Sequence, residues 1–302
     1  MDNEKRIQNL IVPEGKVDVV LDTDAFNEID DQYAIAYLLK SKEKLVTKAI
    51  YAAPFFNAKS VSPADGMEKS YQEILKMLSI MQESVDVYRG SAAYLENENT
   101  PVLSEAARDL AERANAYSPE RPLYVVAIGA ITYVASAILL NPKVAENTVI
   151  VWLGGHAHHF RDTAEFNMRQ DVAAARVVMQ SGAAFVQLPC QGVVSAFTLS
   201  KPEIECWLKG KNPLADYLAD ITIREMDVRT EVPTWKKVIW DVTAVAWLLN
   251  DADRFMESRI VPIRTPGYDN VYEDCDTDHL MQYVYLIKCD KLMHDLIEKI
   301  VG

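Results

Sequence analysis

The chain has 302 residues and a formal net charge of −13, from 31 basic and 44 acidic side chains. Hydrophobic residues make up 49% of it and charged residues 25%, which is typical of a soluble globular protein with a large core. Such an excess of negative charge disfavours binding to nucleic acid or to an anionic membrane, so small molecules and cations are the expected partners.

The sequence carries no visible targeting signal. The first residues, "MDNEKRIQNL", lack the apolar run of a secretory signal, and no apolar run is long enough to span a bilayer. The four cysteines are scattered and form no C-x-x-C pair, which fits reduced thiols. We therefore expect a cytoplasmic protein with no membrane partner.

The hydrophobic pattern alternates between short β-branched runs and segments with helical spacing. In chain order, the pattern predicts a strand over 17–22, a helix over 31–41, a strand over 45–53, a helix over 64–81, a strand over 122–129, a helix over 131–140, a strand over 147–155, a helix over 171–182 and a strand over 183–189. Residues 200–250 read as mainly helical, and residues 279–302 read as a strand followed by a helix.

This alternation predicts an α/β fold with an open, mostly parallel, doubly wound sheet that helices cover on both faces. No linker or internal repeat interrupts the pattern, so we expect residues 1–302 to form a single domain. Ligands of such sheets bind beyond the carboxyl ends of the strands. Five positions fall at strand ends in this interpretation, namely Asp22, Asp24, Asn57, Ile128 and the segment 154–159.

An acidic stretch lies where the first predicted strand passes into the first helix. In "VVLDTDAFNEIDDQYAIAYLL" (19–39) the acids are Asp22, Asp24, Glu28, Asp30 and Asp31. Clustered carboxylates repel one another, and burying them is costly unless a cation compensates. Hard divalent cations take oxygen ligands, so the stretch suggests a metal site, while a solvated acidic helix N-terminus is the simpler alternative.

A phosphatase of the haloacid dehalogenase type has a similar opening. Those enzymes also begin with a strand and Asp-x-Asp, whose first Asp is the nucleophile. They usually carry Thr or Val two residues after the second Asp, where this chain has Phe26. The phosphatase pattern also leaves Asp30 and Asp31 unexplained.

Later segments resemble those of the nucleoside hydrolase family, in the same order along the chain. They are "VYRGS" (88–92), "IGAITYVASAILLNP" (128–142), "AEFNMRQDVAAARVVMQSG" (164–182) and "WDVTAVAWLLN" (240–250). With the opening Asp-x-Asp and Asp-Asp, the resemblance extends from about residue 17 to the C-terminus. It implies a Rossmann-like core and a homodimer or homotetramer that hydrolyses ribonucleosides to free base and ribose.

The resemblance also implies a bound Ca²⁺ and assigns its ligands. Asp24 matches the carboxylate that binds the metal and deprotonates the attacking water. Asp31, Asp241 and the backbone carbonyl of Ile128 match the remaining protein ligands. These roles suit the chemistry, because a bound cation acidifies water and carboxylates stabilise a sugar with oxocarbenium character.

Other positions match residues that hold the sugar. Asp30 and Asp241 match contacts to ribose hydroxyls, and Glu165 and Asn167 match sugar contacts in "AEFN". Asn57, in "APFFN", is a further sugar-binding candidate. The family's Gly-Asn ahead of "AEFN" is missing, and His159 stands where we place that sugar-binding Asn.

The chain departs from the family pattern in ways that bear on the substrate. Five residues, "AFNEI", separate Asp24 from Asp30 where the family has three, so Asn27 or Glu28 is available for extra contacts. Many members carry His before the final metal Asp, as a candidate acid for the leaving base. This chain has Trp240 there, which resembles the purine-specific branch. The His-x-Asp-Gly-Leu-Gly type segment that follows "YRG" in the family is also missing.

We therefore expect hydrolysis of purine nucleosides, with Asp24 and Trp240 acting on the bond that breaks. Two alternatives stay open on the same fold. One is hydrolysis of another ribosyl compound, and the other is a non-catalytic nucleoside or sugar binder that keeps the metal site. The retained Asp24 argues against a binder, which needs no general base.

Overall fold

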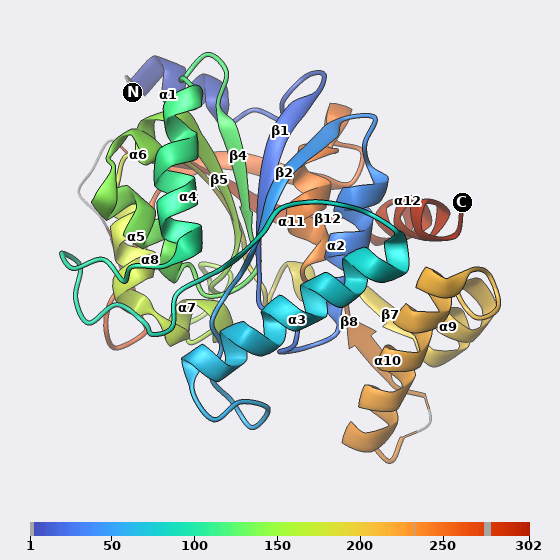
Figure 1. The fold of residues 1–302 in the computed structure, drawn as a ribbon. Coiled ribbons are helices and arrows are strands. Elements are labelled where there is room, and N and C mark those ends of the chain that lie inside the picture. Colours follow the sequence, from blue (N-terminus) through green and yellow to red (C-terminus); the bar gives the residue numbers. More distant parts are fainter. Residues whose placement is uncertain (1–2, 233, 275–278) are drawn as a thin grey trace.

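The computed structural model describes residues 3–232, 234–274 and 279–302. The main feature of these residues is an eight-stranded sheet (Figure 1). Its strand order is β3-β2-β1-β4-β5-β6-β12-β9. The strands are β1 (Val17–Thr23), β2 (Leu45–Ala52), β3 (Val87–Arg89), β4 (Leu123–Ala127), β5 (Thr148–Leu153), β6 (Ala184–Leu188), β9 (Met256–Pro262) and β12 (Leu280–Ile287). Neighbouring strands run parallel except β9, which is antiparallel to β12. The predicted mostly parallel α/β fold is confirmed.

Helices cover both faces of this sheet, as Figure 1 shows. One face packs against α2 (Asp30–Lys40), α3 (Pro63–Met81), α11 (Val242–Leu248) and α12 (Cys289–Val301). The other packs against α4 (Glu105–Arg113), α5 (Thr132–Leu140), α6 (Lys143–Asn147) and α8 (Val172–Gln180). Alternate residues of β1 serve the two faces, since Val19 and Leu21 lie in the first core and Val20 in the second. Burial on both sides explains why the strands read as continuous apolar runs.

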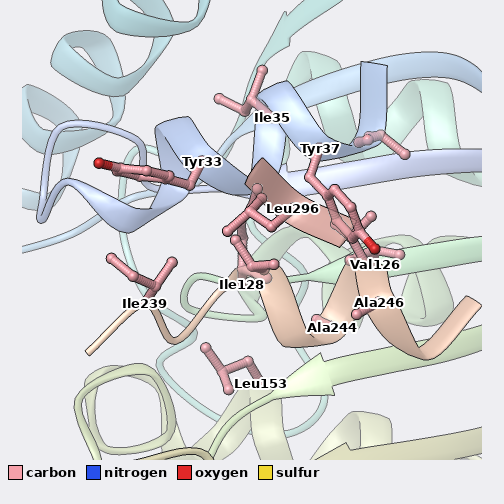
Figure 2. Packing of buried hydrophobic residues seen from close by; sticks show 14 of the residues in the cluster. Tyr33, Ile35, Tyr37, Val126, Ile128, Leu153, Ile239, Ala244, Ala246 and Leu296 are labelled. Carbon is pink, nitrogen blue, oxygen red and sulfur yellow. The ribbon is translucent and has the colours of Figure 1, made fainter. Parts of the chain in front are cut away.

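Close packing between α2 and α11 fixes the position of the acidic stretch. Figure 2 shows Ala244 and Ala246 of α11 near Tyr37 of α2, and all three are buried in one cluster. The small alanines let the two helices approach closely. The Tyr33 hydroxyl lies 2.9 Å from that of Thr222 in α10 (Pro213–Arg229), which ties α2 to that helix as well. The first turns of α2 and α11 are therefore held at the same end of the sheet.

The predicted elements of the sheet and its helices are confirmed, with bounds that differ by one or two residues. Residues 200–250 are mainly helical, as expected, but the expectation omitted two short strands. That segment contains α9 (Lys201–Trp207), α10 (Pro213–Arg229) and α11, but also the antiparallel pair β7 (Thr198–Ser200) and β8 (Lys236–Val238). Strands of three residues are too short to show a period of two in the sequence.

Shorter elements complete the described chain. They are α1 (Asn3–Asn9), α7 (Phe166–Gln170), β10 (Arg264–Pro266), β11 (Tyr272–Asp274) and 3-10 turns at Ala114–Ala116, Val194–Ala196 and Asp251–Asp253. Among the described helices, none combines the length and the apolar character needed to cross a membrane.

The strand order reverses direction between β1 and β4. From β1 the chain builds outward through β2 and β3, whereas β4, β5 and β6 extend the sheet on the other side. Asp22 of β1 pairs with Ala127 of β4, so the segments that follow these two strands leave the sheet side by side. Such a reversal leaves a crevice at the carboxyl ends of the strands, where ligands of this architecture bind.

Candidate active site

A cavity of about 250 Å³ opens at this reversal point. Its lining comes from the ends of β1, β4 and β5, from α7 and from the turn before α11. Of the predicted site residues, the lining includes Asp24, Asp30, Asp31, Ile128, Glu165, Asn167, Trp240 and Asp241. Of the strand-end positions that the sequence singled out, Asp24, Ile128 and His156 of the segment 154–159 lie on this lining, whereas Asp22 and Asn57 do not.

Three buried carboxylates form a compact group in this cavity. Oxygen atoms of Asp30, Asp31 and Asp241 all lie within 4.8 Å of one another. Asp24 is not part of that group of three, although it is buried and lines the same cavity. The hydroxyl of Thr23 donates a hydrogen bond to Asp31, so the end of β1 orients the first turn of α2.

The buried carboxylates raise one another's pKa values. Burial, followed by the charge of Asp31, raises the pKa of Asp24 well above its usual value. Burial and the neighbouring Asp30 raise the pKa of Asp31 to about 7, and burial and Asp30 likewise raise that of Asp241. A fixed cation among these oxygens would lower all three values.

The donor set fits a hard divalent cation. Its candidate ligands are carboxylate oxygens and one backbone carbonyl, which are the atoms that Ca²⁺ and Mg²⁺ prefer. The Oδ2 atom of Asp24 is buried and finds no hydrogen-bond partner among the described residues. An oxygen of this kind is costly to bury unless something cationic binds it.

A lysine that the sequence analysis did not single out lies beside this group. Lys237 of β8 is buried, with its Nζ atom 3.1 Å from Asp30 Oδ1 and in an ion pair with Glu28. Glu28 belongs to the lengthened loop between Asp24 and Asp30, so one residue of the insertion does make an extra contact. Burial raises the pKa of Asp30, and Lys237 partly opposes that rise.

The two residues of "AEFN" hold the site's backbone together. Glu165 caps α7 and accepts hydrogen bonds from the N–H groups of Gly155, Asn167 and Met168 at 2.9–3.0 Å. Burial raises the pKa of Glu165, while these backbone bonds oppose the rise. The side-chain amide of Asn167 donates to the carbonyls of Ile128 and Leu153, each at 3.1 Å.

The Ile128 carbonyl therefore lies at the cavity, next to a predicted sugar-binding residue. A carbonyl oxygen has two lone pairs, so the hydrogen bond from Asn167 leaves one available for a cation. Figure 2 shows Ile128 and Leu153, which follow β4 and end β5, packed among the buried apolar residues beneath the site. The apolar surroundings of this carbonyl hold it in place at the ends of the central strands.

Trp240 contributes both its backbone and its ring. Its N–H group donates to Asp30 Oδ2 at 2.9 Å, and its half-buried side chain lines the cavity. The residue after it, Asp241, begins α11 and uses no side-chain oxygen to cap that helix. The turn between β8 and α11 thus brings Trp240 and the carboxylate of Asp241, which does not cap the helix, to the same cavity.

Two predicted sugar contacts lie outside the cavity lining. Asn57 donates from its amide to Asn27 Oδ1 at 2.6 Å, so it stands behind Asn27, which does line the cavity. His159 is exposed and packs on Phe160, with 4.8 Å between the rings. From the same loop, His156 lines the cavity, as does Cys190 after β6. The sequence placed the segment 154–159 at a strand end, whereas the fold decided which of its histidines lines the cavity.

Comparisons with known proteins agree with this geometry. A model of the family described as inosine-uridine preferring nucleoside hydrolase matches residues 19–282. The chain is 25% identical to the non-specific ribonucleoside hydrolase RihC of Salmonella paratyphi B over 279 residues, covering 82% of this chain and 84% of that protein.

Solved structures show the same fold at low identity. A purine-preferring ribonucleoside hydrolase from Gardnerella vaginalis superposes with a TM-score of 0.74 at 19% identity, covering 94% of this chain and 98% of that one. A plant nucleoside hydrolase, PpNRh1, superposes with a TM-score of 0.73 at 18% identity, covering 96% and 100% of the two chains.

Proposed function

The chain belongs to the inosine-uridine preferring nucleoside hydrolase family, and on that premise we propose that it hydrolyses ribonucleosides to free base and ribose. The observation that carries the proposal is the group of buried carboxylates at the strand-reversal point, in a cavity that also holds Trp240. Family membership leaves no place for the phosphatase alternative.

We propose Ca²⁺ as the cation, with Asp24, Asp31, Asp241 and the Ile128 carbonyl as its protein ligands. The all-oxygen donor set and the mutually raised pKa values of the carboxylates support this choice. Asp30 lies within the same group of three carboxylates, but its ion pair with Lys237 supports the separate role of a ribose contact. A bound cation would supply the fixed positive charge that acidifies and orients the attacking water.

Asp24 is the proposed general base. Its carboxylate takes a proton from the water that attacks C1′ of the ribose, as the bond from C1′ to the base nitrogen breaks. Positive charge then develops on the sugar, and the surrounding carboxylates stabilise it. Asp30, Asp241, Glu165 and Asn167 are the proposed sugar contacts that line the cavity.

Asn57 and His159 are proposed as outer sugar contacts. Asn57 reaches the cavity through its hydrogen bond to Asn27, and His159 belongs to the loop that carries His156. Both would need a substrate that extends beyond the carboxylate group. We also propose that residues 1–302 form one domain, because strands from residue 17 to residue 287 share one sheet.

Purine nucleosides are the proposed preferred substrates, with the indole of Trp240 stacking on the base. An aromatic face attracts positive charge, so stacking favours the protonated form of a departing purine. A pyrimidine ring offers less area for this contact. The position of the Trp240 ring on the cavity lining supports the proposal.

A panel of inosine, guanosine, adenosine, uridine and cytidine tests the proposed function. The protein is incubated with each nucleoside and Ca²⁺, and released ribose and base are quantified by reducing-sugar assay and chromatography. We expect ribose from purine nucleosides at the highest rates, and its loss when the Ca²⁺ is chelated. Absence of ribose with every nucleoside at saturating Ca²⁺ would contradict the proposal.

A further inference from the structure

His156 lies on the cavity lining, in the loop that follows β5, and the proposed reaction has no assigned acid. We propose that His156 gives the leaving base its proton. Trp240 has no suitable group for the role of this acid. This assignment rests on the proposed nucleoside hydrolysis and names one catalytic residue within it.

The backbone at His156 is held on both sides. Its N–H group donates to Thr163 Oγ1 at 3.3 Å, and its carbonyl accepts a hydrogen bond from the Tyr272 hydroxyl at 2.9 Å. The preceding Gly155 has a φ of +76°, and a Cβ there would lie 2.2 Å from the Tyr272 hydroxyl oxygen. A side chain at position 155 would be strained, so glycine suits the tight turn that precedes His156.

The imidazole itself has no structural task in the described chain. Its Nδ1 atom is buried and finds no hydrogen-bond partner among the described residues, and the ring only packs against Phe160 at 5.8 Å. Two other histidines differ in this respect. The ring of His158 lies 3.3 Å from Gln187 Oε1, and that of His279 lies 3.0 Å from the Ala183 carbonyl oxygen.

The other polar groups on the lining are unsuited to giving up a proton. Burial raises the pKa of the Cys190 thiol well above its usual value, so it is a poor proton donor. Glu165 already accepts three backbone hydrogen bonds, and amide side chains do not ionise. The aspartates belong to the proposed cation and sugar contacts. Outside the proposed cation and sugar contacts, His156 is the residue on the described lining whose type ordinarily exchanges a proton near neutral pH.

This assignment accounts for every proton that moves in the reaction. As the bond between C1′ and the base nitrogen breaks, its electron pair stays on the base, and that base takes a proton from the imidazolium of His156. Water supplies OH to C1′, and its proton goes to Asp24. Exchange of protons with solvent then restores both side chains, so the net reaction consumes one water.

The charges around His156 set the direction of its pH dependence. Burial lowers the pKa of His156, and Asp162 on the same loop partly opposes this. Beside α7, Glu165 and Arg169 also line the cavity, and from β11 the Tyr272 phenol donates to the His156 carbonyl. Since an acid must be protonated to act, activity on a poor leaving group should be present below this pKa and fall as pH rises through it.

The test compares two ribosides at saturating Ca²⁺. Inosine has a poor leaving group that needs a proton, whereas 4-nitrophenyl β-D-ribofuranoside releases a stabilised phenolate that does not. For His156→Gln, we expect kcat on inosine to fall by about 10²–10⁴-fold, with the nitrophenyl riboside still hydrolysed at the wild-type rate. The variant should also lose the decline of kcat with rising pH. As a matched control, His294→Gln changes an exposed histidine of α12 and should leave both rates unchanged.

Retained activity on the nitrophenyl riboside also shows that the variant is folded. An equal loss on both substrates, or wild-type turnover of inosine, would overturn the role of His156 while leaving nucleoside hydrolysis intact. A wild-type protein that cleaves neither riboside would overturn the proposed function itself, and this assignment with it.

Discussion

Two halves of the acidic cluster accommodate buried charge in different ways. In one half, Glu28 and Asp30 face the buried ammonium of Lys237, a cation that the chain itself provides. In the other half, Asp31 and Asp241 lie close to Asp30, and Asp24 interacts with them through its charge. The first half is neutralised by the fold, whereas the second has no such partner among the described residues.

The pKa values of Glu28 and Asp31 follow this division, whereas burial raises the pKa of Asp30 although Lys237 opposes the rise. Burial alone would raise the pKa of Glu28, but the charge of Lys237 lowers that pKa below its usual value. Burial and neighbouring acids raise the pKa of Asp31 to about 7. In the function proposed above, the half with Lys237 supports a sugar contact and the other half binds a cation from solution.

The largest effect is expected from the half without a lysine. Asp24→Asn keeps the shape of the side chain but removes its ability to accept a proton, so kcat should fall by about 10²–10⁴-fold. The measurement uses inosine at saturating Ca²⁺, because Asn is also a weaker ligand. Asp220→Asn, which changes an exposed acid of α10, is the control. Near wild-type turnover by Asp24→Asn would remove this residue from the mechanism.

The half with Lys237 should respond mainly in stability. Lys237→Met leaves Glu28 and Asp30 buried without their cation, and breaking a buried ion pair in this way costs about 3–5 kcal/mol. Chemical denaturation of the variant measures that loss. The matched control is Lys236→Met, since Lys236 is the exposed neighbour on β8. If the two variants unfold at the same denaturant concentration, Lys237 is not the internal counter-ion inferred here.

Calcium should stabilise the protein by binding the half without a lysine, which contains Asp24, Asp31 and Asp241. At about 100 times its dissociation constant, an ion that binds only the folded state adds about 2.7 kcal/mol. The pKa of Asp31 is raised when folded, so without the ion its contribution to stability is greatest below the unfolded pKa and is lost as pH rises toward about 7.

The rise in melting temperature on adding Ca²⁺ should therefore be larger at about pH 8 than at about pH 5. Differential scanning calorimetry with and without chelator measures both shifts. The Lys237→Met variant should keep this Ca²⁺ response, because its change lies in the other half. A shift that is larger at the lower pH would contradict the division.

The smallest effect is expected from Trp240, which lines the cavity and donates its N–H group to Asp30. Stacking on a positively charged base contributes about 0.5–2 kcal/mol, so Trp240→Ala should reduce the preference for inosine over uridine by about 2- to 30-fold. The loss should appear in kcat more than in KM, and Trp240→His should shift preference toward uridine. Equal losses for the two nucleosides would make Trp240 a packing residue whose backbone alone holds Asp30.

Much of this protein can be predicted from local sequence patterns. The long strands and helices between β1 and β6 follow from apolar runs and helical spacing, because burial on both faces leaves a strong signal in the chain. The elements β3, α4, α6 and α7 were not predicted. The acidic stretch lies at the end of β1, and "AEFN" at the start of α7, where hydrogen bonding and charge favour such residues. The candidate metal and sugar residues on these segments were therefore visible before the structure.

The contacts between distant segments were decided by the tertiary structure alone. Glu28 and Lys237 are 209 positions apart, and nothing near either residue in the sequence identifies its partner. The place of His156 on the cavity lining was likewise decided by the fold, since His159 in the same loop is exposed. Local patterns reflect which residues are buried, whereas the pairing of charges depends on how β8 and the loop after β5 return to the ends of β1 and β4.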